Sequence, residues 1–278
     1  MKRLIFLFFS LVLCGAGNLR ADENTRALQS RLKDGGFYFG DVNGEYSSQT
    51  AAAVTRYQIR NGLEISGKLD AATAKSLGVA TAPAGATVPP ENSETWRQLR
   101  KPDRQFLERM AATESPSPAP RQAKTIAPPV GQGAPLAPAE TLNSEADHAQ
   151  TFVLSRERLR DYVAAFVLAG IDSHVGAELD FFADRVSYFN EGIVGRDRIQ
   201  RDLQTYDRRW PQRRFWLAGQ VEVEPRPDSR LRVTFPLRYE LRNGSKHSSG
   251  KVRKTLVVEV TGEDLQIVGV DESKADQR

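Results

Sequence analysis

The chain contains 278 residues, of which 40% are hydrophobic and 27% charged, a length that permits two small domains and a connecting segment. Three of the basic residues behind the net charge of +4 (Lys2, Arg3 and Arg20) lie in the first 21 residues, which contain no acid. The rest of the chain therefore carries a net charge of about +1. This near-neutral balance gives no reason to expect a nucleic-acid partner.

Residues 1–21 have the layout of a secretory signal peptide. Two basic residues precede an apolar run from Leu4 to Cys14, which is too short to span a bilayer. We expect cleavage after Ala21 and export to the periplasm or cell envelope. The alternative is a lipoprotein anchored through Cys14, although Leu13 stands where a small residue is normally required. Cleavage after Ala21 would leave no cysteine, which excludes disulfides and thiol catalysis.

Residues 22–79 predict an all-α domain of three short helices. The first helix is expected to end at Gly35-Gly36, because glycine readily adopts the left-handed conformation that closes helices. A second helix is expected from Gln49 to Arg60 behind a serine cap, and a third between Asp70 and Gly78. Apolar positions recur at helical spacing in all three, so the helices are expected to share one small core.

The loop from Gly36 to Gly44 combines three aromatic residues with glycines that permit close backbone approach. The surrounding motif consists of Leu28-Gln29, Thr50, Ala53-Val54, Tyr57-Gln58 and Gly62-Leu63. In this order the residues resemble the peptidoglycan-binding domain built from three helices. The resemblance implies peptidoglycan as the partner.

We expect the wall contacts to come from this loop and from the second helix. Tyr38 is predicted to offer a stacking face, and Asp41, Asn43 and Gln58 are predicted to offer hydrogen bonds to sugar or peptide. Asn43 stands where the family favours an aspartate. These four residues form the predicted peptidoglycan-binding site.

Residues 80–150 are rich in proline and alanine, a composition that cannot bury enough apolar surface to fold. We expect a semi-extended tether that holds the two domains apart. Residues 93–113 interrupt it with Trp96, Leu99 and Phe106, which predict a short amphipathic helix. That helix either docks on a neighbour or forms transiently.

Residues 151–278 predict an α+β domain in which helices precede an antiparallel meander. Ser155 is expected to cap a helix that runs to Ala169, followed by helical segments at 175–182 and 195–206. The Asn243-Gly244 pair predicts a turn, which residues 245–250 are expected to lengthen into a loop. The predicted strands cover residues 185–189, 215–224, 231–242, 252–260 and 265–270.

This element order, with the segment 181–188 and the late Trp210-Pro211, resembles the nuclear-transport-factor-like α+β cone. That superfamily contains both enzymes and non-catalytic binding modules. The resemblance implies a curved antiparallel sheet that wraps the first helix and leaves a pocket. The expected pocket walls are Tyr162, Phe166, Tyr188, Trp210, Trp216 and Tyr239. The alternative is that these aromatic side chains fill the space as core.

No catalytic residue, cofactor or metal site is predicted. The three histidines are scattered, no H-E-x-x-H motif is present, and the acids and bases of the last domain have no spacing that demands chemistry. We therefore expect a multidomain envelope protein that binds peptidoglycan and presents a cone that binds a small ligand or an envelope protein, or pairs as a homodimer. The alternative is an enzyme, of dehydratase, isomerase or hydrolase type, that acts on a small molecule in the cone.

Overall fold

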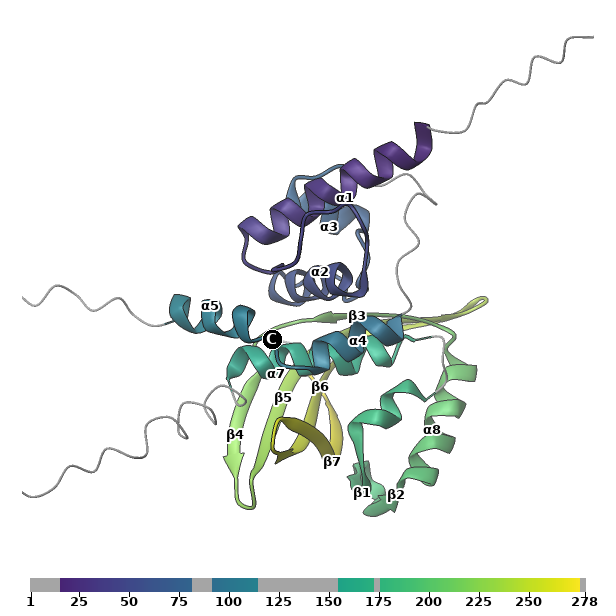
Figure 1. Ribbon diagram of the computed structural model, residues 1–278. Helices are drawn as coiled ribbons and strands as arrows, with labels where there is room; N and C mark the ends of the chain where they lie inside the picture. Colours follow the sequence, from purple (N-terminus) through teal and green to yellow (C-terminus); the bar gives the residue numbers. More distant parts are fainter. Residues whose placement is uncertain (1–15, 82–91, 115–154, 173–175, 276–278) are drawn as a thin grey trace, which may run out of the picture.

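The computed structural model describes residues 16–81, 92–114, 155–172 and 176–275. A bundle of three helices lies against a helix-covered sheet, and two further helices lie where these two units meet (Figure 1). None of the helices in these segments is long and apolar enough to cross a bilayer. Most of the predicted leader falls on residues 1–15, outside the described segments.

The N-terminal unit contains α1 (Ala16–Asp34), α2 (Ser48–Arg60) and α3 (Ala71–Leu77). The Ser47 hydroxyl accepts a hydrogen bond from the Thr50 amide at the start of α2, and the Asp70 carboxylate accepts one from the Thr73 amide at the start of α3. Gly36 ends the first helix at φ 77°, and the Phe37 amide donates back to the Leu32 carbonyl at 2.8 Å. The prediction of three capped helices is confirmed.

Of the residues between the two units, the structure describes 92–114, which form two helices, α4 (Asn92–Arg100) and α5 (Arg104–Glu114), where one had been predicted. The rest of the predicted tether, residues 82–91 and 115–150, lies outside the described segments. Pro102 separates them, since proline disfavours helical backbone in the residue before it. Asp103 caps the second helix by accepting from the Phe106 amide at 3.3 Å. Trp96, Leu99 and Phe106 are buried, so both helices are docked.

The C-terminal unit begins with α7 (Arg156–Ala169), capped by Ser155 as predicted, and a 3₁₀ turn, η1 (Ala177–Phe181). A second 3₁₀ turn, η2 (Phe189–Glu191), follows the first strand. The helix α8 (Arg196–Arg209) follows the second strand. The seven strands are β1 (Phe182–Tyr188), β2 (Ile193–Gly195), β3 (Gln212–Leu217), β4 (Glu222–Arg226), β5 (Arg230–Asn243), β6 (Lys246–Thr261) and β7 (Asp264–Lys274).

These strands form one sheet in the order β2-β1-β7-β6-β5-β3, with β4 pairing the other half of β5. All neighbours are antiparallel except β1 and β7. The predicted α+β architecture with a helix-then-meander order is therefore confirmed.

Three details of the prediction were wrong. The strand expected at 215–224 is two strands, β3 and β4, because the chain leaves the edge of β5 at Leu217 and rejoins it at Glu222. Asn243 pairs directly with Lys246, so the turn is a tight hairpin and not a lengthened loop. The short strand β2 was not predicted, since three residues carry almost no periodic signal.

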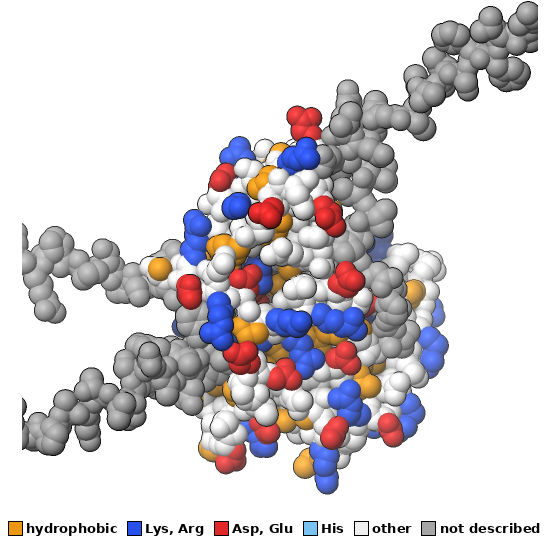
Figure 2. Space-filling view, viewed as in Figure 1, with side chains coloured by type: hydrophobic (Ala, Val, Ile, Leu, Met, Phe, Trp, Pro, Cys, Tyr) orange, Lys and Arg blue, Asp and Glu red, His pale blue; other side chains and the backbone are white. Residues whose placement is uncertain are grey.

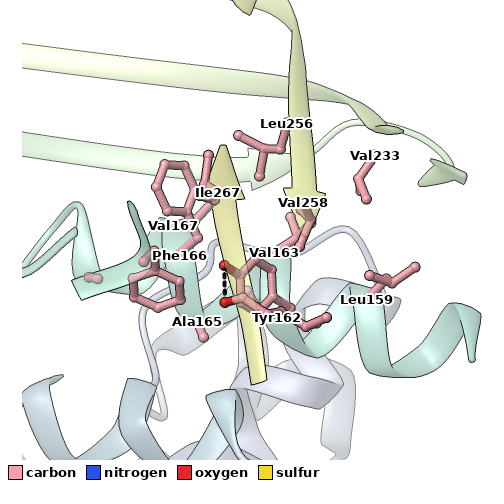
Figure 3. Packing of buried hydrophobic residues seen from close by; sticks show 14 of the residues in the cluster. Leu159, Tyr162, Val163, Ala165, Phe166, Val167, Val233, Leu256, Val258 and Ile267 are labelled. Carbon is pink, nitrogen blue, oxygen red and sulfur yellow. Dashed lines mark hydrogen bonds between the residues drawn. The ribbon is translucent and has the colours of Figure 1, made fainter. Parts of the chain in front are cut away.

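Helix α7 packs across the concave side of the sheet. Figure 3 shows Leu159, Val163 and Val167 of α7 beside Leu256 and Val258 of β6 and Ile267 of β7. Leu159, Val163 and the three strand residues are fully buried. Each large apolar side chain buried in this layer contributes roughly 1.5–3 kcal/mol to the stability of the unit.

The two units are packed together, so the expectation of domains held apart by a tether was wrong. Ile59 and Ile65 of the N-terminal unit belong to the same apolar cluster as the core of the cone, and Trp96 of α4 lies between them. The Ile65 amide donates to the Phe215 carbonyl at 2.9 Å, which adds a rung to the exposed edge of β3.

Buried charges also cross this contact. Arg56 and Arg60 of α2 both bond to Asp161 of α7, at 3.0 and 3.1 Å, and Arg60 also pairs with Glu157 at 2.5 Å. Arg158 of α7 reaches the last carbonyls of α4, which closes the end of that helix. The paired side chains, Arg56, Arg60, Glu157 and Asp161, are all at least nine-tenths buried. The sequence could not reveal these pairs, because about a hundred residues separate the partners.

Candidate functional site

The first candidate site is the loop between α1 and α2, which buried polar groups hold in one shape. Gln29 is fully buried, and its amide donates to the Glu45 carbonyl at 2.9 Å and to Asn43 Oδ1 at 3.0 Å. Its carbonyl accepts from the Gly44 amide at 2.8 Å. Because one buried side chain satisfies several loop groups, the loop is rigid before any ligand arrives.

The structure changes the role of two predicted wall-binding residues. The Tyr38 ring is only 3% exposed, and its hydroxyl donates to the Asp41 carbonyl at 3.0 Å, so it is a core residue and not a stacking face. Gln58 is fully buried and accepts from the amides of Ser66 and Gly67, which shapes the α2–α3 loop. Neither side chain can contact a wall polymer from these positions.

The other two predicted residues lie on the surface. Asp41 and Asn43 are exposed, and Val42 between them is 39% exposed. Asn43 also supports the loop, since its Oδ1 accepts from the Glu45 amide at 2.9 Å. The exposed part of the loop therefore presents two carboxylates, Asp41 and Glu45, one partly used amide and one apolar side chain.

The second candidate site is a cavity of about 390 Å³ in the cone, between α8 and the concave side of the sheet. Three of the six predicted walls line it, namely Phe166, Tyr188 and Tyr239. Further apolar walls come from Val167, Phe182, Leu203, Phe215, Leu237, Leu241 and Val252. A cavity of this size and lining is typical of small-molecule sites.

The other three predicted walls lie elsewhere. The Tyr162 hydroxyl donates to the Leu265 carbonyl at 2.9 Å within the core. Trp216 lies on the opposite face of β3 from Phe215, where Arg238 stacks 3.9 Å from its ring centre. Trp210 follows the end of α8. Strand alternation places Trp216 outside the cavity. The prediction had not decided toward which face of the sheet this side chain points.

Acidic and basic groups also line the cavity, and none of them had been predicted as site residues. Glu178 is 7% exposed, and burial raises the pKa of its carboxyl to about 7, while nearby Asp207 adds to the rise and Arg213 and Lys254 oppose it. The Tyr188 hydroxyl donates to Asp202 at 2.6 Å.

Burial, together with this hydrogen bond, raises the Tyr188 pKa well above its usual value. Burial also raises the pKa of Tyr206 to about 12, so this phenol stays protonated and can donate a hydrogen bond. Asp202 follows Ile199 by three residues on α8, so helical spacing was the signal that could have placed it on the inner face.

The cavity thus combines apolar walls with one carboxyl that changes charge near neutral pH and several fixed donors. Lys254 lies 3.4 Å from Glu272 at the rim. The Glu178 carboxyl can donate or accept a proton near neutral pH. Within the described segments, no group of three or more His, Cys, Asp or Glu residues is arranged to hold a metal ion.

Comparison with known structures gives likenesses of low identity. An NTF2-like protein with a cystatin-like fold from Novosphingobium aromaticivorans is 13% identical over 50% of this chain and 94% of its own, with a TM-score of 0.39. Aln2 from Streptomyces sp. is 10% identical over 42% of this chain and 87% of its own, with a TM-score of 0.37. Bd1075 from Bdellovibrio bacteriovorus is 15% identical over 49% and 44%, with a TM-score of 0.36.

No curated protein matches the chain. Residues 21–77 match the family model described as "Putative peptidoglycan binding domain". The match begins inside α1 and ends with α3, so it covers the three-helix unit and the shaped loop. The chain therefore carries a peptidoglycan-binding domain of three helices, followed by an α+β cone.

Proposed function

We propose that this protein is exported to the cell envelope, where its N-terminal unit binds peptidoglycan and its cone presents a binding cavity. The observation that carries the proposal is the family match over residues 21–77, the same residues that form the three-helix unit with its rigid loop. Peptidoglycan is a repeating polymer, so many weak contacts suffice to hold a protein on it.

Export agrees with this partner, because peptidoglycan lies outside the cytoplasm. The leader at residues 1–21 supplies the route, with cleavage after Ala21 as the main case and a lipid anchor on Cys14 as the alternative. Mass measurement of the mature protein separates the two outcomes, since a lipidated protein begins at Cys14 and carries acyl chains.

Sedimentation of residues 22–278 with purified, insoluble peptidoglycan tests the wall-binding proposal, with chitin as a control polymer. The protein is expected to pellet with peptidoglycan and stay in solution with chitin. Replacing the exposed loop residues Asp41 and Val42 by alanine is expected to reduce the pelleted fraction. Equal amounts in both pellets, or none in either, would contradict the proposal.

A second candidate function is small-molecule binding or proton-transfer chemistry in the cone. The specific observation that favours it is the buried Glu178 carboxyl in the same cavity as the Tyr188–Asp202 pair. We infer a ligand with an apolar body, because most of the cavity wall is aliphatic or aromatic. Binding is the primary role, and catalysis would need Glu178 as the proton donor or acceptor.

The probe 8-anilino-1-naphthalenesulfonate tests whether the cavity takes apolar ligands. The wild type is expected to bind it at one saturable site, and Leu203→Trp, which fills the cavity, is expected to abolish that site. Arg201→Trp is the matched control, because Arg201 is exposed on the same helix and does not line the cavity. Unchanged probe binding by Leu203→Trp would rule out this cavity as the site.

A further inference from the structure

A separate cleft of about 420 Å³ lies where the N-terminal unit meets the turn between α4 and α5. One wall consists of Phe39 from the shaped loop and Gln49 from the first turn of α2. The other wall consists of Gln98, Lys101 and Gln105. The family match ends at residue 77, so this second wall lies outside the matched domain.

The floor of the cleft is fixed by buried charges. Arg56 is 3% exposed and bonds to Asp103 and Asp161, each at 3.0 Å. Phe106 lies under its guanidinium at 5.1 Å. Since Asp103 belongs to the α4–α5 turn and Arg56 to α2, the two walls are held at a set distance before a ligand binds.

The rim of the cleft is positively charged. Lys101 and Arg104 are exposed, and Lys101 forms no ion pair with any residue in the described segments. Arg104 pairs with Glu263, but both side chains are more than 60% exposed, so water and salt weaken the pair. Figure 2 shows several Lys and Arg side chains across the middle of the drawn face, with Asp and Glu side chains above and below them.

Three exposed glutamines complete the lining, namely Gln49, Gln98 and Gln105. Each carboxamide can donate two hydrogen bonds and accept two, which suits the amide groups of a peptide. Cations at the rim suit the carboxylates of the same ligand. Phe39 is half-buried and is the sole aromatic side chain that lines the cleft, whereas sugar rings favour exposed aromatic faces.

We propose that this composite cleft binds the acidic peptide part of peptidoglycan, with the loop and α2 as one wall and the α4–α5 turn as the other. The inference rests on the proposed wall-binding function and names the part of the polymer that is recognised. It assigns a binding role to residues 98–105, which had been predicted to belong to a short amphipathic helix within the linker.

The test is sedimentation of full residues 22–278 with insoluble peptidoglycan at several protein concentrations. Lys101→Glu/Arg104→Glu is expected to weaken binding by about tenfold or more, because charge-assisted bonds are lost and repulsion replaces them. Lys68→Glu/Lys75→Glu is the matched control, since these exposed lysines lie on the N-terminal unit and do not line the cleft. The neutral variant Gln98→Ala/Gln105→Ala is expected to weaken binding without a change in charge.

The outcomes separate this inference from the wall-binding function itself. If the wild type pellets and the cleft variants pellet equally well, the cleft assignment is wrong and the wall-binding function stands. If the wild type does not pellet, the wall-binding function fails. Glycan strands stripped of peptide by an amidase form the second arm, and undiminished binding to them would overturn the assignment to peptide.

Discussion

The buried carboxyl of Glu178 gives the sharpest quantitative prediction. Its pKa is raised from 4.5 to about 7 in the folded protein, which corresponds to about 3 kcal/mol of folding free energy. The folded state holds this proton to a higher pH than the unfolded chain does. The contribution of Glu178 to the free energy of unfolding is therefore largest below about pH 4.5, and it decreases as the pH rises to about 7.

Glu178→Gln removes the titration and keeps the size of the side chain. We expect the stability of the variant relative to wild type to rise by about 3 kcal/mol between about pH 4.5 and pH 8. Taking the difference cancels most of the titration of other groups. The charged groups that influence Glu178, namely Lys254, Arg213 and Asp207, stay in place in both proteins.

Urea unfolding followed by far-ultraviolet circular dichroism at several pH values measures this difference. Leu203→Ala is the control, since it alters the same cavity without a titrating group and should show an offset that does not depend on pH. A constant difference between Glu178→Gln and wild type over the whole range would refute the argument that burial keeps Glu178 protonated.

Three further predictions concern packing. Asp161→Ala leaves the buried Arg56 and Arg60 without their shared carboxylate, and urea unfolding should show a free energy of unfolding lower by about 3–5 kcal/mol. A loss below about 1 kcal/mol would mean that water or another acid replaces the carboxylate. Tyr38→Phe should cost about 1 kcal/mol and leave peptidoglycan pelleting unchanged, whereas lost pelleting with intact stability would restore Tyr38 as a contact. Gly36→Ala should lower stability by at least about 1–2 kcal/mol, because its φ is 77° and the new Cβ would meet the Arg109 side chain; wild-type stability would show that this turn relaxes freely.

Local signals in the sequence were sufficient for the helix ends. Ser47, Asp70 and Ser155 cap helices, and Gly36 and Gly78 end them, through bonds that join residues at most five apart. Such bonds depend little on the rest of the fold. The same locality made the long alternating strand β5 predictable almost to its ends.

Those local signals did not indicate which side chains face the solvent and which face the interior. The loop pattern placed Tyr38 beside Asp41, but which of the two faces solvent depends on Gln29, a residue from another element that organises the loop from within. In the cone, Trp216 and Phe215 are adjacent in sequence and lie on opposite faces of β3. Aromatic content alone therefore placed three of the six predicted residues correctly on the cavity wall.

Composition was also a poor guide to residues 92–114, the part of the segment between the units that the structure describes. Proline-rich flanks favoured a tether, yet α4 and α5 bury Trp96, Leu99 and Phe106 against both units. The stabilising partners, Arg158 for α4 and Arg56 for the α4–α5 turn, are distant in sequence. A short amphipathic helix gains most of its stability from such docking, and helix propensity in the sequence does not predict this contribution.

The docked arrangement links the proposed peptide-binding cleft to the cavity in the cone through one helix, α7. Asp161 of α7 holds Arg56 at the floor of the cleft, and Phe166, five residues later on α7, forms part of the cavity wall in the cone. Five residues of α-helix turn the side chain to another face and advance it by about 7–8 Å, so one rigid helix carries a contact to each site. A polymer bound at the cleft would therefore hold the cavity at a set distance and orientation from the wall, which a flexible tether would not do.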